Sequence, residues 1–150
     1  MRRKEKAVTD PAAIEAIIDG AQVCRLAMCD QTGPYVVPLC FGFRQGAFYF
    51  HSAGEGRKLD ILDANPKVCL ELESEVSLKT GETPCKWGMG FRSVIAFGTV
   101  MRITDPAEKR KALDVIMDHY GSGPWNYTEK ALEATVVLRM AVDHMTAKHS

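Results

Sequence analysis

The sequence has no excess of charge of either sign and no long apolar run. Its 19 Lys and Arg residues balance 19 Asp and Glu residues, so the formal net charge is zero. A general binder of nucleic acid or of anionic membranes needs a surplus of basic charge. The basic start MRRKEK leads into an amphipathic helix rather than an apolar stretch, which indicates neither a secretion signal nor a membrane span. We therefore expect a cytoplasmic protein that binds neither nucleic acid nor membrane.

Metal-binding cysteine pairs and familiar catalytic motifs are also missing. The five cysteines are Cys24, Cys29, Cys40, Cys69 and Cys85. Their odd number favours reduced, buried thiols, and no pair has the two-residue gap of a zinc knuckle, so we expect no metal site. There is no GxSxG or Walker motif, and no nucleophile–base pair stands out. We therefore expect a cofactor to supply any redox or transfer chemistry.

The composition that remains is that of a globular protein. Hydrophobic residues make up 46% of the chain and charged residues 25%, which is typical of a folded domain and not of disorder. A length of 150 residues allows one domain with a proper core and is too short for two ordinary ones. We expect a single domain over residues 1–150.

Two Asp-Pro pairs predict the starts of two helices. Each places a capping carboxylate before a proline suited to the first helical turn. The first helix begins after Asp10 and carries an apolar stripe that ends before Gly20, where we expect a left-handed cap. The second begins after Asp105 and runs to Tyr120. A short helix at 57–65 and one helical turn at 129–133 complete the helices.

The remaining apolar segments predict antiparallel strands. They cover residues 22–29, 34–43, 47–52, 67–78, 91–104 and 134–146. The first three are joined by short turns and should form a meander, whereas 79–90 reads as a loop. No segment shows the alternating strand–helix order of a parallel sheet. Six or seven antiparallel strands with short helices favour a small closed or split β-barrel, because closure removes exposed strand edges.

The segment from Pro34 to Lys58, PYVVPLCFGFRQGAFYFHSAGEGRK, carries most of the functional information. An apolar hairpin runs directly into a loop of small residues that holds His51, Ser52, Arg57 and Lys58. Glycine backbone, a hydroxyl and two cations together suit a phosphate. Cations in a first helical turn oppose the helix dipole, and a bound anion removes that conflict. A flat aromatic cofactor could then lie along the strands.

Each of these residues also has a simpler interpretation. His51 could be a half-buried histidine bonded to the backbone, and Arg57 and Lys58 could be solvated. The loop residues Trp87 and Trp125 could close the ends of a barrel, although loop aromatics also stack on flat ligands and fill subunit interfaces. Ser93 could be an ordinary strand serine or a hydroxyl for the same phosphate.

The whole pattern resembles the flavin-binding split-barrel superfamily typified by pyridoxamine 5′-phosphate oxidase. Within it, the chain looks most like the nitroimidazole-resistance branch. The resemblance runs from Met1 to near Ser150. It rests on the segments MRRKEK with TDP, VCRLAM, GPYVVPLCFGF, FYFHSAGEGRK, NPKVCLE, CKWGMGFRSVIAFG and MTAKHS.

This resemblance implies a six-stranded split barrel that forms a homodimer, with one FMN in each of two interfacial grooves. Val37, Pro38 and Leu39 would run along the isoalloxazine, and His51 and Ser52 would lie beside the flavin and its tail. Arg57, Lys58 and Ser93 are the implied phosphate ligands. Trp87 or Trp125 would reach the groove from the partner subunit. In the branch it resembles, the histidine of FYFHSA is proposed to sit by the ligand, which makes His51 the catalytic candidate.

Two departures from the family pattern affect the substrate. The closing MTAKHS offers little of the basic segment with which pyridoxamine phosphate oxidases recognise their substrate, which argues against vitamin B6 oxidation. Many relatives carry asparagine at the position of Cys40. If that residue contacts the ring, Cys40 changes the local polarity.

Three functions remain open at this point. The first is an FMN-dependent oxidoreductase that reduces a small electron-poor aromatic, such as a nitroimidazole, with NADH or NADPH. The second is a flavin- or haem-binding protein without dedicated turnover, acting as a sensor, scavenger or carrier. The third is a structural dimer whose ligand groove is vestigial. We favour the first.

Overall fold

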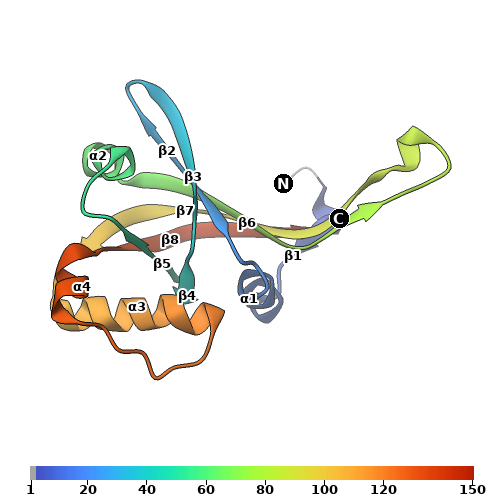
Figure 1. Ribbon diagram of the computed structural model, residues 1–150. Helices are drawn as coiled ribbons and strands as arrows, with labels where there is room; N and C mark the ends of the chain where they lie inside the picture. The colour runs from blue at the N-terminus through green and yellow to red at the C-terminus, as the bar shows by residue number, and fades with distance from the viewer. Residues whose placement is uncertain (1–2) are drawn as a thin grey trace.

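The computed structural model describes residues 3–150, and within them eight strands form one antiparallel sheet (Figure 1). The strands are β1 (Ala7–Val8), β2 (Cys24–Asp30), β3 (Gly33–Leu39), β4 (Gly42–Arg44), β5 (Ala47–Ser52), β6 (Lys67–Lys79), β7 (Gly88–Ile103) and β8 (Val136–His149). Their order across the sheet is β3-β2-β6-β7-β8-β5-β4, and β1 pairs with β8. The prediction of an antiparallel, mainly β fold with short helices is confirmed.

Four α-helices and two short 3₁₀ turns are inserted between the strands. They are η1 (Lys4–Lys6), α1 (Pro11–Asp19), α2 (Arg57–Ala64), η2 (Pro84–Lys86), α3 (Pro106–Tyr120) and α4 (Glu129–Ala134). The Asp10 carboxylate accepts a hydrogen bond from the Ala13 N–H at the start of α1, and Asp105 accepts one from Glu108 at the start of α3. Both predicted caps are confirmed. Gly20 has φ of −79°, so the predicted left-handed cap is wrong.

The predicted strand count and the predicted meander are both wrong. Within residues 3–150 the sheet has eight strands instead of the six or seven predicted, and its end strands β3 and β4 are not paired with each other, so the barrel is not closed. The expected strand 34–43 is broken between β3 and β4, where the Phe41 side chain is fully buried and its N–H donates to the Tyr120 hydroxyl at 3.0 Å. This break separates the hairpins β2–β3 and β4–β5, which lie at opposite ends of the strand order.

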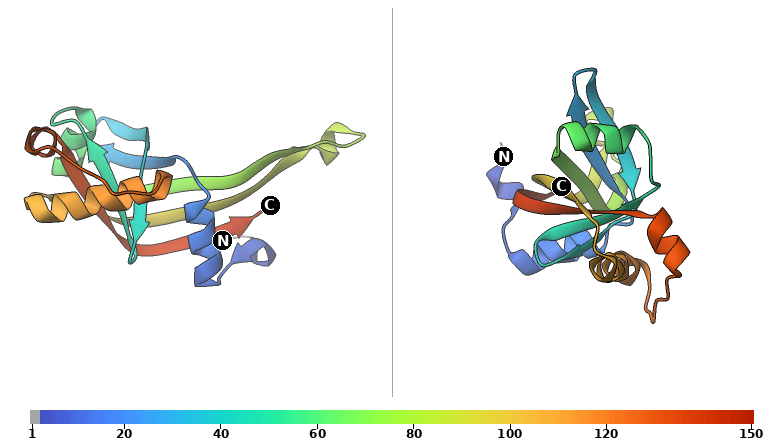
Figure 2. Two further views of the ribbon diagram at one scale, coloured as in Figure 1. Left: turned by 60° about the horizontal axis from the view of Figure 1, so that its bottom comes forward. Right: turned by 90° about the vertical axis from the view of Figure 1, so that its left-hand side faces the viewer.

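The helices cover particular parts of the curled sheet (Figure 2). Helix α3 packs against β4, β5 and β8, and α2 packs against β2. The main core lies inside the curl and contains the largest fully buried side chains, which include Phe41, Phe48 and Phe50. Within residues 3–150, no helix is both long enough and apolar enough to cross a membrane.

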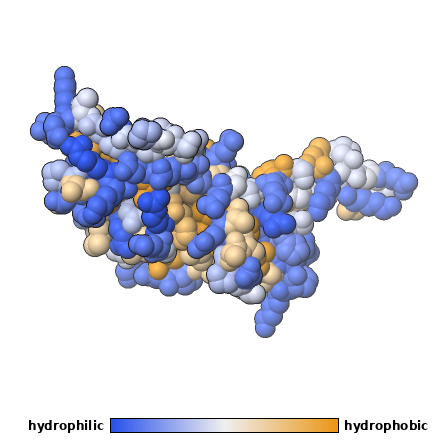
Figure 3. Space-filling model, turned by 90° about the horizontal axis from the view of Figure 1, so that it is seen from below, coloured by the Kyte–Doolittle hydropathy of each residue, from blue (hydrophilic) through white to orange (hydrophobic). Residues whose placement is uncertain are grey.

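A two-stranded arm projects from the body of the molecule (Figures 1 and 2). The ends of β6 and β7 form it, so much of the predicted loop 79–90 is instead the tip of a long hairpin. At its base, Arg92 forms an ion pair with Glu75 at 2.9 Å. At its tip, the Trp87 indole N–H donates to the Gly81 carbonyl at 2.7 Å. Apolar side chains are exposed along this arm (Figure 3).

Candidate functional site

The predicted phosphate loop ends at Gly56, where the backbone conformation requires glycine. Gly56 precedes α2 with φ of 129°, a conformation that side chains other than glycine rarely adopt. The next residue, Arg57, donates a hydrogen bond to Thr32 Oγ1 at 3.0 Å. Its guanidinium carbon also lies 4.6 Å from the centre of the Tyr35 ring. The structure therefore places this predicted phosphate ligand against strand β3.

Lys58 is a cation that has no anionic partner among the described residues. Its side chain is half-buried, and burial lowers its pKa from the ordinary lysine value. It makes no hydrogen bond or ion pair with any of the residues that the structure describes. A half-buried ammonium group without a partner is costly, and a bound phosphate would relieve that cost.

A cavity of about 640 Å³ separates the β2–β3 turn from α2. Thr32 and Arg57 line it, together with the carboxylates of Asp30 and Asp60. Hydrogen bonds from the Thr32 hydroxyl and backbone hold the pKa of Asp30 below its usual value. Asp30 is therefore ionised at neutral pH, so an anion held by Arg57 would lie on the side of the guanidinium away from it.

The predicted flavin strand is an edge of the sheet. Val37, Pro38 and Leu39 all belong to β3, which pairs only with β2 among the described residues. Val37 and Leu39 are half-buried and pack against the core, whereas Pro38 is exposed. An edge strand leaves backbone N–H and C=O groups unpaired along one side. A planar heterocycle with polar edges can form hydrogen bonds with these groups.

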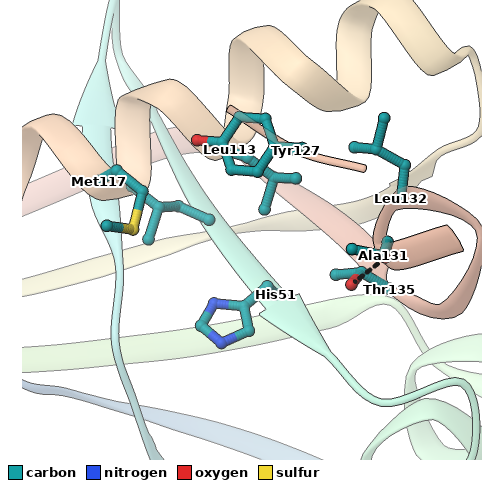
Figure 4. Close-up of a pocket in the computed structure, with 8 residues that line it drawn as sticks. His51, Leu113, Met117, Tyr127, Ala131, Leu132 and Thr135 are labelled. Atoms are coloured by element: carbon teal, nitrogen blue, oxygen red, sulfur yellow. Dashed lines mark hydrogen bonds between the residues drawn. The ribbon is translucent and has the colours of Figure 1, made fainter. Parts of the chain in front are cut away.

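His51 lines a second cavity, of about 170 Å³, which lies between β5 and the helices α3 and α4 (Figure 4). The cavity is lined by His51, Leu113, Ile116, Met117, Tyr127, Ala131, Leu132 and Thr135. The His51 side chain is exposed and makes no hydrogen bond within residues 3–150. The Thr135 hydroxyl, by contrast, donates to the Ala131 carbonyl at 2.7 Å.

Tyr127 has a buried hydroxyl without a partner. Its Oη atom makes no hydrogen bond of acceptable geometry with any described residue. Burial first, and then the neighbouring Asp114 carboxylate, raise the pKa of Tyr127 to about 12. The phenol is therefore neutral at physiological pH and has a proton to donate.

The other predicted site residues lie elsewhere. Ser93 is buried on β7 between Glu73 and Lys148, roughly 30 Å along the strand from Arg102, which pairs with Asp63 of α2. Trp87 lies at the tip of the arm, and Trp125 lies in the loop after α3, where its indole N–H donates to Asp118 at 2.8 Å. Their roles at a flavin stay predictions.

Within one chain, the structure therefore divides the predicted site. Arg57 joins β3 through Tyr35, while His51 faces α3 and α4, and the two cavities share no lining residue. Ser52 is half-buried and follows His51 at the end of β5. Among residues 3–150, no group of three or more His, Cys, Asp or Glu side chains is placed to hold a metal ion.

Thr32, Tyr35 and Tyr127 are not among the site residues predicted from the sequence. Tyr35 was predictable, because residues two apart in a strand point to the same face, and Tyr35 therefore shares a face with Val37 and Leu39. Tyr127 has no such signal in the sequence, because it lies in a loop without a regular pattern of apolar residues.

The cysteines also differ from expectation. Within the described residues all five are free, but only Cys24 is buried, and Cys29, Cys40 and Cys85 are exposed. Burial raises the pKa of Cys24 to about 12, so this thiol is inert. Cys40 lies in the link between β3 and β4, directly after the predicted flavin strand.

A model of the pyridoxamine 5′-phosphate oxidase family matches residues 10–149. The chain belongs to this family. The resemblance seen in the sequence is thus confirmed, and its nitroimidazole-resistance branch is supported by a solved structure. That structure is of a candidate 5-nitroimidazole antibiotic resistance protein from Bacteroides thetaiotaomicron. The two sequences are 36% identical, the alignment covers 95% of this chain and 86% of that one, and the TM-score is 0.86.

Two solved structures of lower identity show a likeness of fold alone. The flavocytochrome Anf3 from Azotobacter vinelandii is 23% identical with a TM-score of 0.87, and the match covers all of this chain and 72% of that one. An FAD- and haem-binding protein from Mycobacterium smegmatis is 22% identical with a TM-score of 0.86, covering 97% and 73%. No curated protein matches this pyridoxamine 5′-phosphate oxidase family member at a significant level.

Proposed function

We propose that this family member is an FMN-dependent oxidoreductase that uses a nicotinamide donor to reduce a small electron-poor aromatic, such as a nitroimidazole. The observation that carries the flavin assignment is the contact between Arg57 and Tyr35, which brings a cation of the phosphate loop to the predicted flavin strand. The choice of a nitroimidazole as the electron acceptor is supported by the 36% identity to the candidate nitroimidazole resistance protein.

The residues present fit a flavin mononucleotide. Lys58 lacks an anionic partner within residues 3–150, Arg57 lies at the first position of α2, and Gly56 allows the backbone to turn there. These three would hold the phosphate, and Val37 to Leu39 would lie along the ring system. Bound FMN would supply the electron transfer that the side chains of this protein cannot perform.

His51 is the proposed proton donor. An exposed imidazole without a hydrogen-bond partner among residues 3–150 can turn a ring nitrogen towards a substrate at the mouth of its cavity. Protonated at that nitrogen, it would neutralise negative charge that develops on the reduced acceptor.

We further propose a homodimer with FMN at the subunit interface. Within one chain, Ser93 lies far along β7 from α2 and Trp87 lies at the tip of the arm, so both are far from the phosphate loop. In a dimer related by two-fold symmetry, the same residues of a second copy can approach that loop instead.

The test is an absorbance spectrum of the purified protein, recorded anaerobically before and after FMN and then NADH or NADPH are added. Flavin bands that bleach with the donor and recover with a nitroimidazole support the proposal. Flavin that binds but never bleaches favours a carrier or sensor. A haem spectrum, or no flavin binding at all, contradicts the FMN assignment.

Phosphate recognition is tested in the same experiment with riboflavin, which lacks the phosphate. Lys58→Ala should weaken FMN binding about tenfold or more, the loss expected for a charge-assisted hydrogen bond, and leave riboflavin binding unchanged. Lys130→Ala is the matched control, because Lys130 is an exposed cation on α4. Equal losses for FMN and riboflavin would contradict a phosphate role for Lys58.

A further inference from the structure

The cavity beside His51 has the size of one aromatic ring. Its volume is about 170 Å³, and its walls are mainly the apolar side chains of Leu113, Ile116, Met117 and Leu132. An apolar protein cavity of about 150 Å³ is known to bind benzene. The three fused rings of an isoalloxazine are much larger than benzene, so this cavity is not the place of a flavin ring.

The polar groups of this cavity limit what kind of ring can bind. No Asp, Glu, Lys or Arg side chain lines it, so a charged ring would lose its hydration without compensation. Thr135 already donates to Ala131. The Tyr127 hydroxyl is buried and makes no hydrogen bond in the part of the chain that the structure describes, and the Asp114 carboxylate on α3 is its neighbouring acceptor outside the cavity lining. Leaving such a group unpaired is unfavourable, and a ligand atom that accepts its proton would remove the penalty.

We infer that the cavity formed by β5, α3 and α4 binds a single neutral aromatic ring that carries a hydrogen-bond acceptor, with the Tyr127 hydroxyl as the donor. The Tyr127 ring lies beside Leu113 on one side of the cavity, and His51 lies on the other (Figure 4). Tyr127 is thus a specificity-determining residue. Ring binding does not require flavin; only the identification of the ring as the electron acceptor rests on the proposed function.

Binding can be measured by ¹⁹F NMR on protein without added flavin. The probes are 4-fluoronitrobenzene, fluorobenzene without an acceptor, and 4-fluoro-1-nitronaphthalene with two rings. We expect saturable binding of both single-ring probes and none of the two-ring probe. Tyr127→Phe should weaken 4-fluoronitrobenzene about five- to tenfold, the value of one net hydrogen bond, and leave fluorobenzene unchanged.

Two further variants make the test specific. Tyr49→Phe is the matched control, because Tyr49 lies on the same strand as His51 but outside the cavity, and it should change neither affinity. Leu132→Trp fills the cavity and should abolish binding of both rings, and Leu113→Phe serves if that variant does not fold.

The results separate this inference from the proposed function. Absence of ring binding, an unchanged nitro affinity in Tyr127→Phe, or binding of the naphthalene overturns the inference. An unchanged nitro affinity would mean that the hydroxyl turns to Asp114 instead. Ring binding with no flavin uptake confirms the inference and contradicts only the proposed function.

Discussion

The two loop tryptophans look alike in the sequence but have different partners. The Trp125 indole N–H donates to Asp118 Oδ1 at 2.8 Å, and Arg44 pairs with Asp118 Oδ2 at 2.9 Å. Trp87 instead bonds to the backbone of the arm. Trp125 therefore helps to hold the end of α3 to β4, a structural role that the family resemblance did not suggest.

These contacts predict the titration of Asp118. The Trp125 N–H, and then Arg44, hold the pKa of this carboxyl below the ordinary aspartate value of about 3.9. Measured by NMR, the pKa should rise towards that value in Trp125→Phe and stay low in the control Trp87→Phe. An Asp118 that titrates normally in the unchanged protein would contradict the contact.

The sign of the linked stability follows from the same shift. Because the pKa of Asp118 is lower in the folded state, its contribution is present above the unfolded value and is lost as pH falls through the folded value. Trp125→Phe should therefore reduce stability at neutral pH more than at a pH below the folded pKa of Asp118, where the carboxyl is protonated in both states.

At the scale of elements, helix α3 and strand β4 approach each other closely at Gly42. A Cβ built on Gly42 would lie 2.3 Å from the Val115 carbonyl oxygen of α3, which the packing cannot accommodate. Gly42→Ala should lower the free energy of unfolding by about 1–3 kcal/mol, because α3 must move off β4. Urea denaturation measures the change.

The matched control for this substitution is Gly88→Ala on β7. A Cβ there meets no atom within 4 Å, and its backbone is not in the left-handed region, so the change should stay within about 0.5 kcal/mol. Similar losses at both glycines would contradict the clash as the cause, because the lower entropy of the unfolded chain after Gly→Ala favours folding at either position.

Local signals predicted the individual elements well and their arrangement poorly. The Asp-Pro starts of α1 and α3 are correct, because a cap involves only neighbouring residues. The strand order is non-local: the buried Phe41 breaks the expected strand 34–43, and its hydrogen bond to Tyr120 joins residues 79 positions apart. The contact between Arg57 and Tyr35 likewise depends on how α2 meets the β2–β3 hairpin, so the sequence could name the cation but not its neighbour.

For the whole molecule, the arm is the feature that one chain leaves unexplained. Val76, Leu78, Trp87 and Met89 are 53%, 61%, 52% and 44% exposed. Leu78 and Met89 are directly opposite each other across the two strands. A two-stranded ribbon is marginally stable in water by itself, so these side chains need a surface to pack on. The proposed homodimer would provide one.

We expect the chain to be a dimer by sedimentation and the double variant Leu78→Glu, Met89→Glu to be shifted towards monomer. Val23→Glu is the control, because Val23 is an exposed apolar residue outside the arm.

In a Trp125→Phe background, Trp87 is the remaining tryptophan, and its fluorescence reports directly on the arm. Its emission should move to longer wavelength on dilution, because dissociation returns the indole to water. A dimer whose Trp87 emission is independent of concentration down to the monomer would place the interface elsewhere, and a monomer at every concentration would contradict an interfacial flavin site.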